Sequence, residues 1–216
     1  MKKFLPVIIV LLILIGGGAA VLLTKDDSKN NNATSANNNN QTKTTGVFDA
    51  LATTGTSFIA TITSTNNGKS VESKMEYDQK NDAVRYTTAV GGSEASYIFI
   101  NDAYYICQSA SKCFKYPASQ GNSSGFDRKA YEYSNEELAG FKNTSVDGGE
   151  GACPAGTCHI WKVANGGYES SVYIDTKTKR ISQVESTSAA GTSKITYEYK
   201  DVTVTAPKNA QELPQV

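Results

Sequence analysis

The chain has 216 residues, and its 21 basic and 21 acidic side chains give a formal net charge of zero. Residues 47–216 carry 16 basic and 19 acidic groups, and this mildly acidic balance predicts no nucleic-acid partner and no affinity for anionic headgroups. This part is long enough for one domain with a hydrophobic core, and its many Tyr, Thr, Val and Ile residues favour strands.

Residues 4–23 form an apolar stretch without a charge. As a helix it would span ~30 Å, the thickness of a bilayer's hydrocarbon core, so we expect a transmembrane signal-anchor. The two lysines before it predict that residues 1–3 are cytoplasmic and that the rest of the chain is extracytoplasmic. A cleaved signal peptide is the alternative, with small residues at 18–20, but the apolar run continues past them.

The next segment, residues 24–45, holds seven asparagines and no aliphatic side chain larger than alanine. Such a composition cannot bury enough apolar surface to offset the entropy of ordering it, so a disordered Asn/Thr-rich linker is predicted. Residues 46–207 are then expected to form one β-rich domain on the outer side of the cell membrane. A polar tail is predicted over 208–216.

Within the domain, apolar and polar residues alternate with a period of two, which is typical of an antiparallel sheet wetted on one face. Asn66–Gly68 and Asn101–Asp102 supply turn residues that tolerate a positive φ. Val202 and Val204 fall on the opposite parity to the preceding strand, which predicts a bulge or an eleventh short strand. The ten main strand candidates are 57–65, 69–78, 83–90, 95–100, 103–107, 113–116, 158–164, 168–175, 180–186 and 194–200.

Helical signals are few. Ser134 and Glu137 match a capping box, which predicts a helix around 136–142. Residues 46–54 have apolar residues on one helical face and predict a second short helix. The glycine-rich residues 148–156 and the polar residues 117–125 are expected to be loops.

The four cysteines fall into two short-range pairs, Cys107 with Cys113 and Cys153 with Cys158. Outside the cytoplasm disulfides are the default, so these two pairings are favoured among the three that are possible. A zinc site with His159 is the alternative, but the spacings do not match those of the usual ligand pairs. No metal or other cofactor is therefore expected.

No motif in the chain is diagnostic of an enzyme. G-x-S-x-G, H-E-x-x-H and phosphate-loop patterns are all absent from the sequence. His159 is the one histidine, and without a partner motif it is interpreted as structural. Asp175 opens a polar turn and is interpreted as a turn former. The sequence therefore predicts a protein that is not an enzyme.

Three stretches in this order of elements resemble the LolA-like lipoprotein-carrier and lipoprotein-localisation superfamily, including its anchored lipid-binding lipoproteins. They are VYIDTKTKRISQV at 172–184, ITYEYKDVTVTAP at 195–207 and SYIFINDAYYICQSASKCFKYP at 96–117. The resemblance covers most of 47–207. The anchored relatives are usually lipidated at a cysteine, and this chain has none after its apolar stretch.

The resemblance implies a mainly β fold with a few short helices (α+β), in which a curved antiparallel sheet, or half-barrel, is closed by a helical lid. In the family that hollow holds acyl chains, so a lipid or other apolar small molecule is the expected ligand. The alternative is a structural or interaction domain whose own side chains fill the hollow, and for each candidate taken individually core packing is favoured. The implied ligand-contact residues are Val71, Met75, Tyr77, Phe99, Leu138, Phe141, Tyr197 and Tyr199.

Overall fold

The computed structural model describes residues 48–90, 93–117, 131–165 and 168–212. The predicted cytoplasmic N-terminus, membrane anchor and linker lie outside the described residues, as do positions 118–125 of the expected polar loop and the last four residues of the tail. Within the described ranges no helix is long and apolar enough to cross a membrane.

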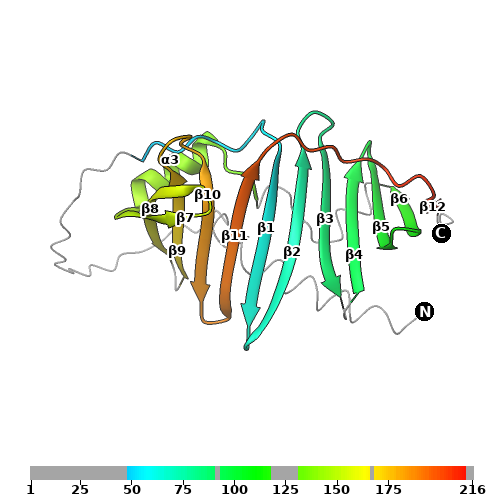
Figure 1. Ribbon diagram of the computed structural model, residues 1–216, viewed down its shortest axis with the longest axis horizontal. Helices are drawn as coiled ribbons and strands as arrows, with labels where there is room; N and C mark the ends of the chain where they lie inside the picture. Colours follow the sequence, from blue (N-terminus) through cyan, green and yellow to red (C-terminus); the bar gives the residue numbers. More distant parts are fainter. Residues whose placement is uncertain (1–47, 91–92, 118–130, 166–167, 213–216) are drawn as a thin grey trace, which may run out of the picture.

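Twelve strands form one open, curved sheet in the order β12-β6-β5-β4-β3-β2-β1-β11-β10-β9-β8-β7 (Figure 1). All neighbours are antiparallel except β12 and β6, which are parallel. The predicted mainly β fold with a curved antiparallel sheet is thus confirmed. The strands are β1 Phe58–Asn66, β2 Lys69–Asp78, β3 Ala83–Val90, β4 Ser93–Ile100, β5 Ala103–Ser109, β6 Lys112–Pro117, β7 Val146–Cys153, β8 Gly156–Asn165, β9 Tyr168–Asp175, β10 Ile181–Ser188, β11 Gly191–Tyr199 and β12 Gln211–Glu212.

Two tight hairpins fall where the turn residues predicted them. Asn67 and Gly68 connect β1 to β2 with φ of 50° and 73°, and Asn101 and Asp102 connect β4 to β5 with φ of 53° and 54°. Paired positive φ values give the turn a twist that matches the right-handed twist of the flanking strands. These turns fix the register of both hairpins.

The described residues contain one α-helix, α3 (Asn135–Thr144), and it begins with the predicted capping box. The Ser134 hydroxyl accepts a hydrogen bond from the Glu137 backbone N–H at 3.2 Å, and the Ser134 N–H donates to Glu137 Oε2 at 2.7 Å. Leu138 and Phe141 are the buried residues of the helix.

The second predicted helix is wrong for its described part, residues 48–54. Leu51 N–H donates to the Lys179 carbonyl at 2.7 Å, and Thr53 N–H donates to the Tyr133 carbonyl at 2.9 Å. The backbone groups of this segment therefore pair with distant segments instead of with each other. A helix this short is costly to nucleate, so the tertiary partners prevail.

The glycine-rich stretch expected as a loop contains the edge strand β7. A Cβ at Gly151 would lie 2.7 Å from Ile160 Cδ1 on β8, so any larger residue there would require the Ile160 side chain to move. Gly149 has a φ of +78°, and the pairing shifts by a bulge between Asp147 and Glu150. The loop prediction failed because the glycines serve close strand packing and a bulge.

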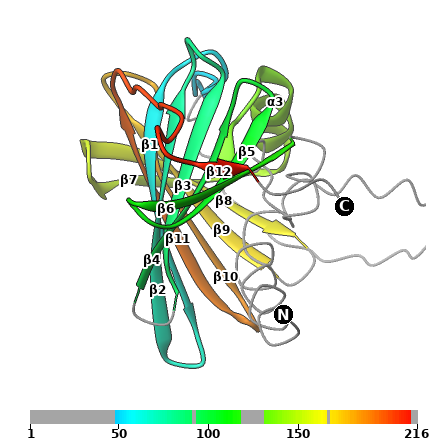
Figure 2. The same cartoon turned by 90° about the vertical axis from the view of Figure 1, so that its right-hand side faces the viewer.

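The sheet is covered differently on its two faces. We call the face that carries α3 the inner face, and the opposite one the outer face. Residues 200–210, the C-terminal segment, cross the outer face on their way to β12 (Figures 1 and 2). Val202, Val204, Ala206 and Ala210 of this segment pack on a cluster from β3–β6 that includes Ile98, Ile100 and Tyr105. The parity change at Val202 thus marks the point where the chain leaves the sheet, and no added strand follows directly.

A buried carboxylate holds the C-terminal segment to the sheet. Asp78, at the end of β2, is 1% exposed and accepts a hydrogen bond from the Val204 N–H at 3.1 Å. Burial alone would raise the pKa of Asp78, but hydrogen bonds from the Asn81 side chain and from backbone N–H groups outweigh it and lower the pKa. The ionised form is therefore the one that the fold stabilises.

Replacing Asp78 with Ala should lower the free energy of unfolding by about 2 kcal/mol, because the Val204 N–H loses a charged acceptor. Urea titrations at neutral pH of the wild type, Asp78→Ala and the control Glu72→Ala, an exposed position on the same strand, measure this loss of free energy. The pKa of Asp78 is lower in the folded protein than in the unfolded chain. The extra stability of the wild type is therefore fully present above the unfolded pKa of about 3.9, and it is lost as the pH falls through the folded pKa. Equal effects of the two substitutions at neutral pH would contradict this account.

Candidate functional site

Aromatic side chains line up across the inner face because the strand register places them opposite one another. Phe58 on β1 lies between Tyr77 on β2 and Tyr199 on β11. Ring centroids are 5.5 Å apart for Phe58 and Tyr77 and 6.4 Å apart for Phe58 and Tyr199. We call the whole set the aromatic row; from β6 to β11 it runs Tyr116, Tyr104, Phe99, Val84, Tyr77, Phe58 and Tyr199, with one aliphatic member on β3.

One half of the inner face is closed. Leu138 and Phe141 of α3, together with Tyr131 and Tyr133 just before the helix, belong to the same core cluster as Phe58. Phe58 has no accessible surface. α3 contacts β8, so the helix covers the end of the sheet that carries β7–β9 (Figure 1). The described helix is therefore an end cover, which is less than the lid implied by the resemblance.

The other half of the inner face is less completely covered. Five apolar or aromatic residues of β4, β5 and β6 keep part of their surface accessible, and we call them the half-buried patch: Tyr97, Phe99, Ile106, Phe114 and Tyr116. They adjoin one another by register, since Tyr97 faces Ile106 and Ile106 faces Phe114. The patch is the part of the inner face best placed to contact a ligand.

Away from the aromatic row, hydroxyl groups replace apolar ones. Ser73 donates to the Thr88 hydroxyl at 2.8 Å, and the Ser170 and Ser186 hydroxyls lie 3.0 Å apart. Val71 lies opposite Ser64 at this end and is 37% exposed. The apolar part of the inner face is therefore a band, and it does not extend over the whole sheet.

Seven of the eight predicted ligand-contact residues come together in the structure. Met75, Tyr77, Leu138, Phe141 and Tyr197 are buried members of one core cluster, and Phe99 and Tyr199 pack against it. Val71 does not join them. A role in ligand binding stays a prediction for all eight.

The phenol groups near α3 are satisfied and neutral. Tyr197 donates to the Tyr131 carbonyl at 3.3 Å, and Tyr199 donates to the Ile181 carbonyl at 2.8 Å. Burial raises the pKa of Tyr133 to about 12 and raises the pKa values of Tyr197 and Tyr199 as well. These groups act as hydrogen-bonded packing residues at neutral pH.

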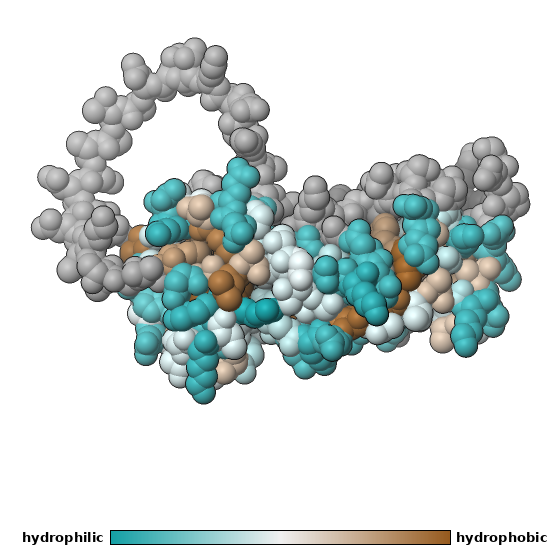
Figure 3. Space-filling model, turned by 90° about the horizontal axis from the view of Figure 1, so that it is seen from above, coloured by the Kyte–Doolittle hydropathy of each residue, from teal (hydrophilic) through white to brown (hydrophobic). Residues whose placement is uncertain are grey.

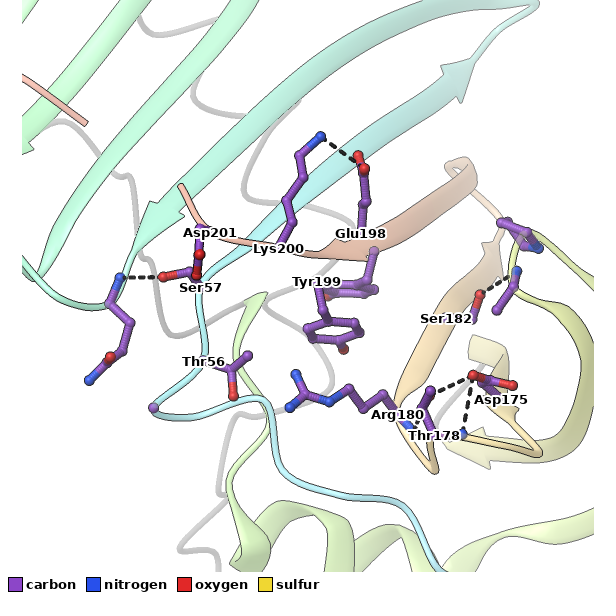
Figure 4. A pocket seen from close by; sticks show the side chains of 15 residues that line it. Thr56, Ser57, Asp175, Thr178, Arg180, Ser182, Glu198, Tyr199, Lys200 and Asp201 are labelled. Carbon is purple, nitrogen blue, oxygen red and sulfur yellow. Dashed lines mark hydrogen bonds and ion pairs between the residues drawn. The ribbon is translucent and has the colours of Figure 1, made fainter. Parts of the chain in front are cut away.

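A separate cavity of about 850 Å³ opens at the upper rim, where β1 and β10 begin and β11 ends (Figure 4). We call it the rim pocket. Thr56, Ser57, Thr178 and Ser182 supply hydroxyls to its lining, and Asp175, Arg180, Glu198, Lys200 and Asp201 supply charges. Tyr197 and Tyr199 complete it on the side of the sheet.

Sequence reasoning missed the rim pocket because its residues look like ordinary turn and surface positions. Asp175 behaves as the predicted turn former and accepts hydrogen bonds from Lys177 N–H and from the N–H and hydroxyl of Thr178. The one available signal was the number of polar residues near 175–182 and 198–201, which a strand pattern treats as solvated. Their convergence depends on the pairing of β11 with both β1 and β10.

His159 is held in a structural arrangement that agrees with its interpretation from the sequence. Its Nε2 lies 2.7 Å from Asp147 Oδ1, and its ring stacks on Trp161 with centroids 5.1 Å apart. In the parts of the chain that the structure describes, no group of three or more His, Cys, Asp or Glu residues could hold a metal ion.

All four cysteines form the two predicted disulfides. Cys107 faces Cys113 across the β5–β6 hairpin, with Cα atoms 4.0 Å apart. Cys153 and Cys158 close the β7–β8 turn, with Cα atoms 5.9 Å apart. Each bridge fixes a hairpin end, and the first also packs in the outer-face cluster.

Seen from above, the rim presents hydrophobic surface at two places that hydrophilic side chains separate (Figure 3). One lies at the end of the sheet that carries α3, and the other lies toward the end that carries β12. Leu51, near the first, is 51% exposed. The rim between them is polar, in agreement with the charged lining of the rim pocket.

No protein-family model and no curated protein matches the sequence. Among solved structures, LprF from Mycobacterium bovis is similar with a TM-score of 0.51 and 14% identity, over 72% of this chain and 90% of that one. The lipoprotein LppX from Mycobacterium tuberculosis is similar with a TM-score of 0.46 and 10% identity, over 69% of this chain and 88% of that one. A LolA superfamily protein from Nitrosomonas europaea has a TM-score of 0.27 and 9% identity, over 73% of this chain and 90% of that one. The likeness to LprF concerns the fold alone, and it agrees with the fold that the resemblance predicted.

The two halves of the inner face should respond differently to truncation. Phe58→Ala should lower the free energy of unfolding by about 3–5 kcal/mol, because it leaves a cavity in the closed half. Phe114→Ala should cost roughly 1–2 kcal/mol, because its side chain keeps accessible surface. Urea titration monitored by Trp161 fluorescence measures both, and equal losses would contradict the division of the face.

The hairpin disulfide should contribute measurably to stability. A double substitution, Cys107→Ser with Cys113→Ser, should lower the free energy of unfolding by about 2 kcal/mol, since a short loop is no longer closed in the unfolded chain. Ser109→Ala in the same turn is the control, because it leaves the bridge intact. Unfolding curves of the two variants that coincide would count against this contribution.

Proposed function

We propose that this protein is a membrane-anchored, extracytoplasmic binding protein that holds a lipid or other apolar small molecule against the half-buried patch. The observation that carries the proposal is the uneven covering of the inner face. Apolar residues that serve only as a core are normally buried, as those near α3 are. The five patch residues of β4–β6 retain accessible surface and adjoin one another, as ligand-contact residues do, while Tyr104 between them is 3% exposed.

In this proposal the closed half lies beside the ligand and packs as a core. Met75 has no accessible surface and Tyr77 is 5% exposed, so these two predicted contacts support the neighbouring strands of the patch. Phe99 is the predicted residue that belongs to both the patch and the aromatic row. Phe114 and Ile106, which sequence reasoning did not select, extend the contact surface across β5 and β6.

The proposed location draws on several independent features. Two disulfides suit an oxidising compartment outside the cytoplasm. The apolar stretch at 4–23 and the linker at 24–45 suit a tether that keeps the domain at the membrane surface. A binding role is proposed in preference to a catalytic one.

The filled core favours a second function. The described inner face near α3 is packed by the protein's own side chains, with Phe58 and Met75 fully buried. A domain of this kind would serve as a structural or interaction module of the envelope. The two functions differ in one observable, which is whether an apolar molecule occupies the patch.

Photocrosslinking of a fatty acid that carries a diazirine should distinguish them. The full chain, purified in dodecyl maltoside, is irradiated with the probe, and the modified peptides are mapped by mass spectrometry. We expect adducts on residues 96–116, which include the whole patch. Phe114→Ser should lower this labelling roughly tenfold, because the apolar contact of one large side chain is lost.

The control is Val146→Ser, which removes an exposed apolar side chain on β7, far from the patch in the strand order. It should leave labelling of 96–116 unchanged. Labelling confined to residues 4–23, in a protein with both disulfides intact, would overturn the binding function in favour of the structural one.

A further inference from the structure

The Arg180 backbone is fixed at the mouth of the rim pocket. Its carbonyl accepts a hydrogen bond from the Asp175 N–H at 2.9 Å, and the residue forms a parallel bridge with Leu51. Contacts with two neighbouring segments therefore fix the position of the Arg180 backbone. Figure 4 shows that the side chain runs beneath the Tyr199 ring toward Thr56.

The Arg180 guanidinium is positioned by stacking and keeps its hydrogen-bond donors. Its central carbon lies 4.7 Å from the centroid of the Tyr199 ring, and the Tyr199 hydroxyl is itself anchored to the Ile181 carbonyl. Stacking occupies the face of the guanidinium, and the N–H groups, which lie in its plane, stay available as donors. Within the described ranges, no carboxylate forms an ion pair with it.

Three other charged groups of the pocket already have partners. Both oxygens of Asp175 are used within its own turn, and Lys200 pairs with Glu198 at 2.8 Å. Asp201 is exposed and forms no ion pair with a described residue. Arg180 and Asp201 are thus the charged residues of this lining that form no ion pair and no side-chain hydrogen bond with a described residue (Figure 4).

Two hydroxyls of the lining are available as donors. Ser57 Oγ accepts from the Gln79 N–H at 3.0 Å, and Ser182 Oγ accepts from the Ala155 N–H at 3.3 Å. Because each oxygen already accepts a backbone hydrogen bond, its proton can be donated to a bound group. The lining therefore combines a cation, two hydroxyl donors and a carboxylate.

We propose that the rim pocket binds a small zwitterion, with a phosphate or carboxylate of the ligand at Arg180 and an ammonium group at Asp201. A guanidinium with free in-plane donors suits an oxyanion because it can bind two oxygens at once. The carboxylate of Asp201 makes the cavity a poorer site for a simple anion than for a molecule that also carries a positive charge. This site is separate from the half-buried patch and does not depend on the function proposed for it.

Isothermal titration calorimetry of the full chain in dodecyl maltoside tests the site with O-phosphoethanolamine, inorganic phosphate and ethanolamine as probes. O-phosphoethanolamine should bind most tightly. Arg180→Gln should weaken its binding and that of phosphate roughly tenfold or more, because a charge-assisted bidentate contact is lost. Asp201→Asn should weaken the binding of O-phosphoethanolamine and leave the affinity for phosphate unchanged or higher.

The matched control is Lys177→Gln, which removes the same charge from an exposed position in the adjacent turn. It should leave all affinities unchanged. If Arg180→Gln fails to fold, Arg180→Lys keeps the charge and should still weaken phosphate binding, because the forked geometry is lost.

No saturable heat with any probe up to about 10 mM would overturn the proposal, since affinities weaker than this carry little specific binding energy. Equal affinity for phosphate and O-phosphoethanolamine would overturn the assignment to Asp201. A further comparison with lysophosphatidylethanolamine separates two sources of the same chemistry. Tighter binding than the free headgroup indicates a membrane lipid, and equal binding indicates a soluble molecule. Either result supports the zwitterion site.

Discussion

The strand register around Phe58 is the constraint on which the inner face depends. Phe58 has no accessible surface and contacts aromatic rings on both neighbouring strands, Tyr77 and Tyr199. Because side chains alternate between the faces of a strand, a slip of one residue in β1 would move its aromatic and aliphatic side chains to the outer face. The turn at Asn67 and Gly68 fixes one side of this register, and β11 fixes the other.

A wide open sheet cannot protect both its faces by itself, so other segments must complete the two cores. Here α3 and the residues before it cover one end of the inner face, and the C-terminal segment covers part of the outer face. The coverings differ in chemistry as well as in place. The inner one is aromatic and leaves a half-buried patch, whereas the outer one is aliphatic and is held by the buried carboxylate of Asp78. Both coverings bury apolar side chains, and the inner one leaves the half-buried patch partly accessible.

Local sequence signals were sufficient for most of the strands, for the capped helix and for both disulfides. In each case the deciding residues lie close together, such as Ser134 with Glu137 or Cys107 with Cys113. The features that were missed depend on residues far apart in the chain. Gly151 lies against Ile160 of the neighbouring strand, and the rim pocket forms where segments such as those of Arg180 and Tyr199 converge. A pattern of alternation carries no information on such approaches.

The order of the strands has a consequence for how the sheet assembles. Strands β1–β6 form one run of hairpins and β7–β11 form another, and every pairing inside a run joins neighbours in the chain. The two runs meet at β1 and β11, where Phe58 pairs with Tyr199. Contacts between distant residues form slowly because a long loop must first close. Each run can therefore develop its hairpins early, and the slow step of folding is the joining of the two halves along this seam.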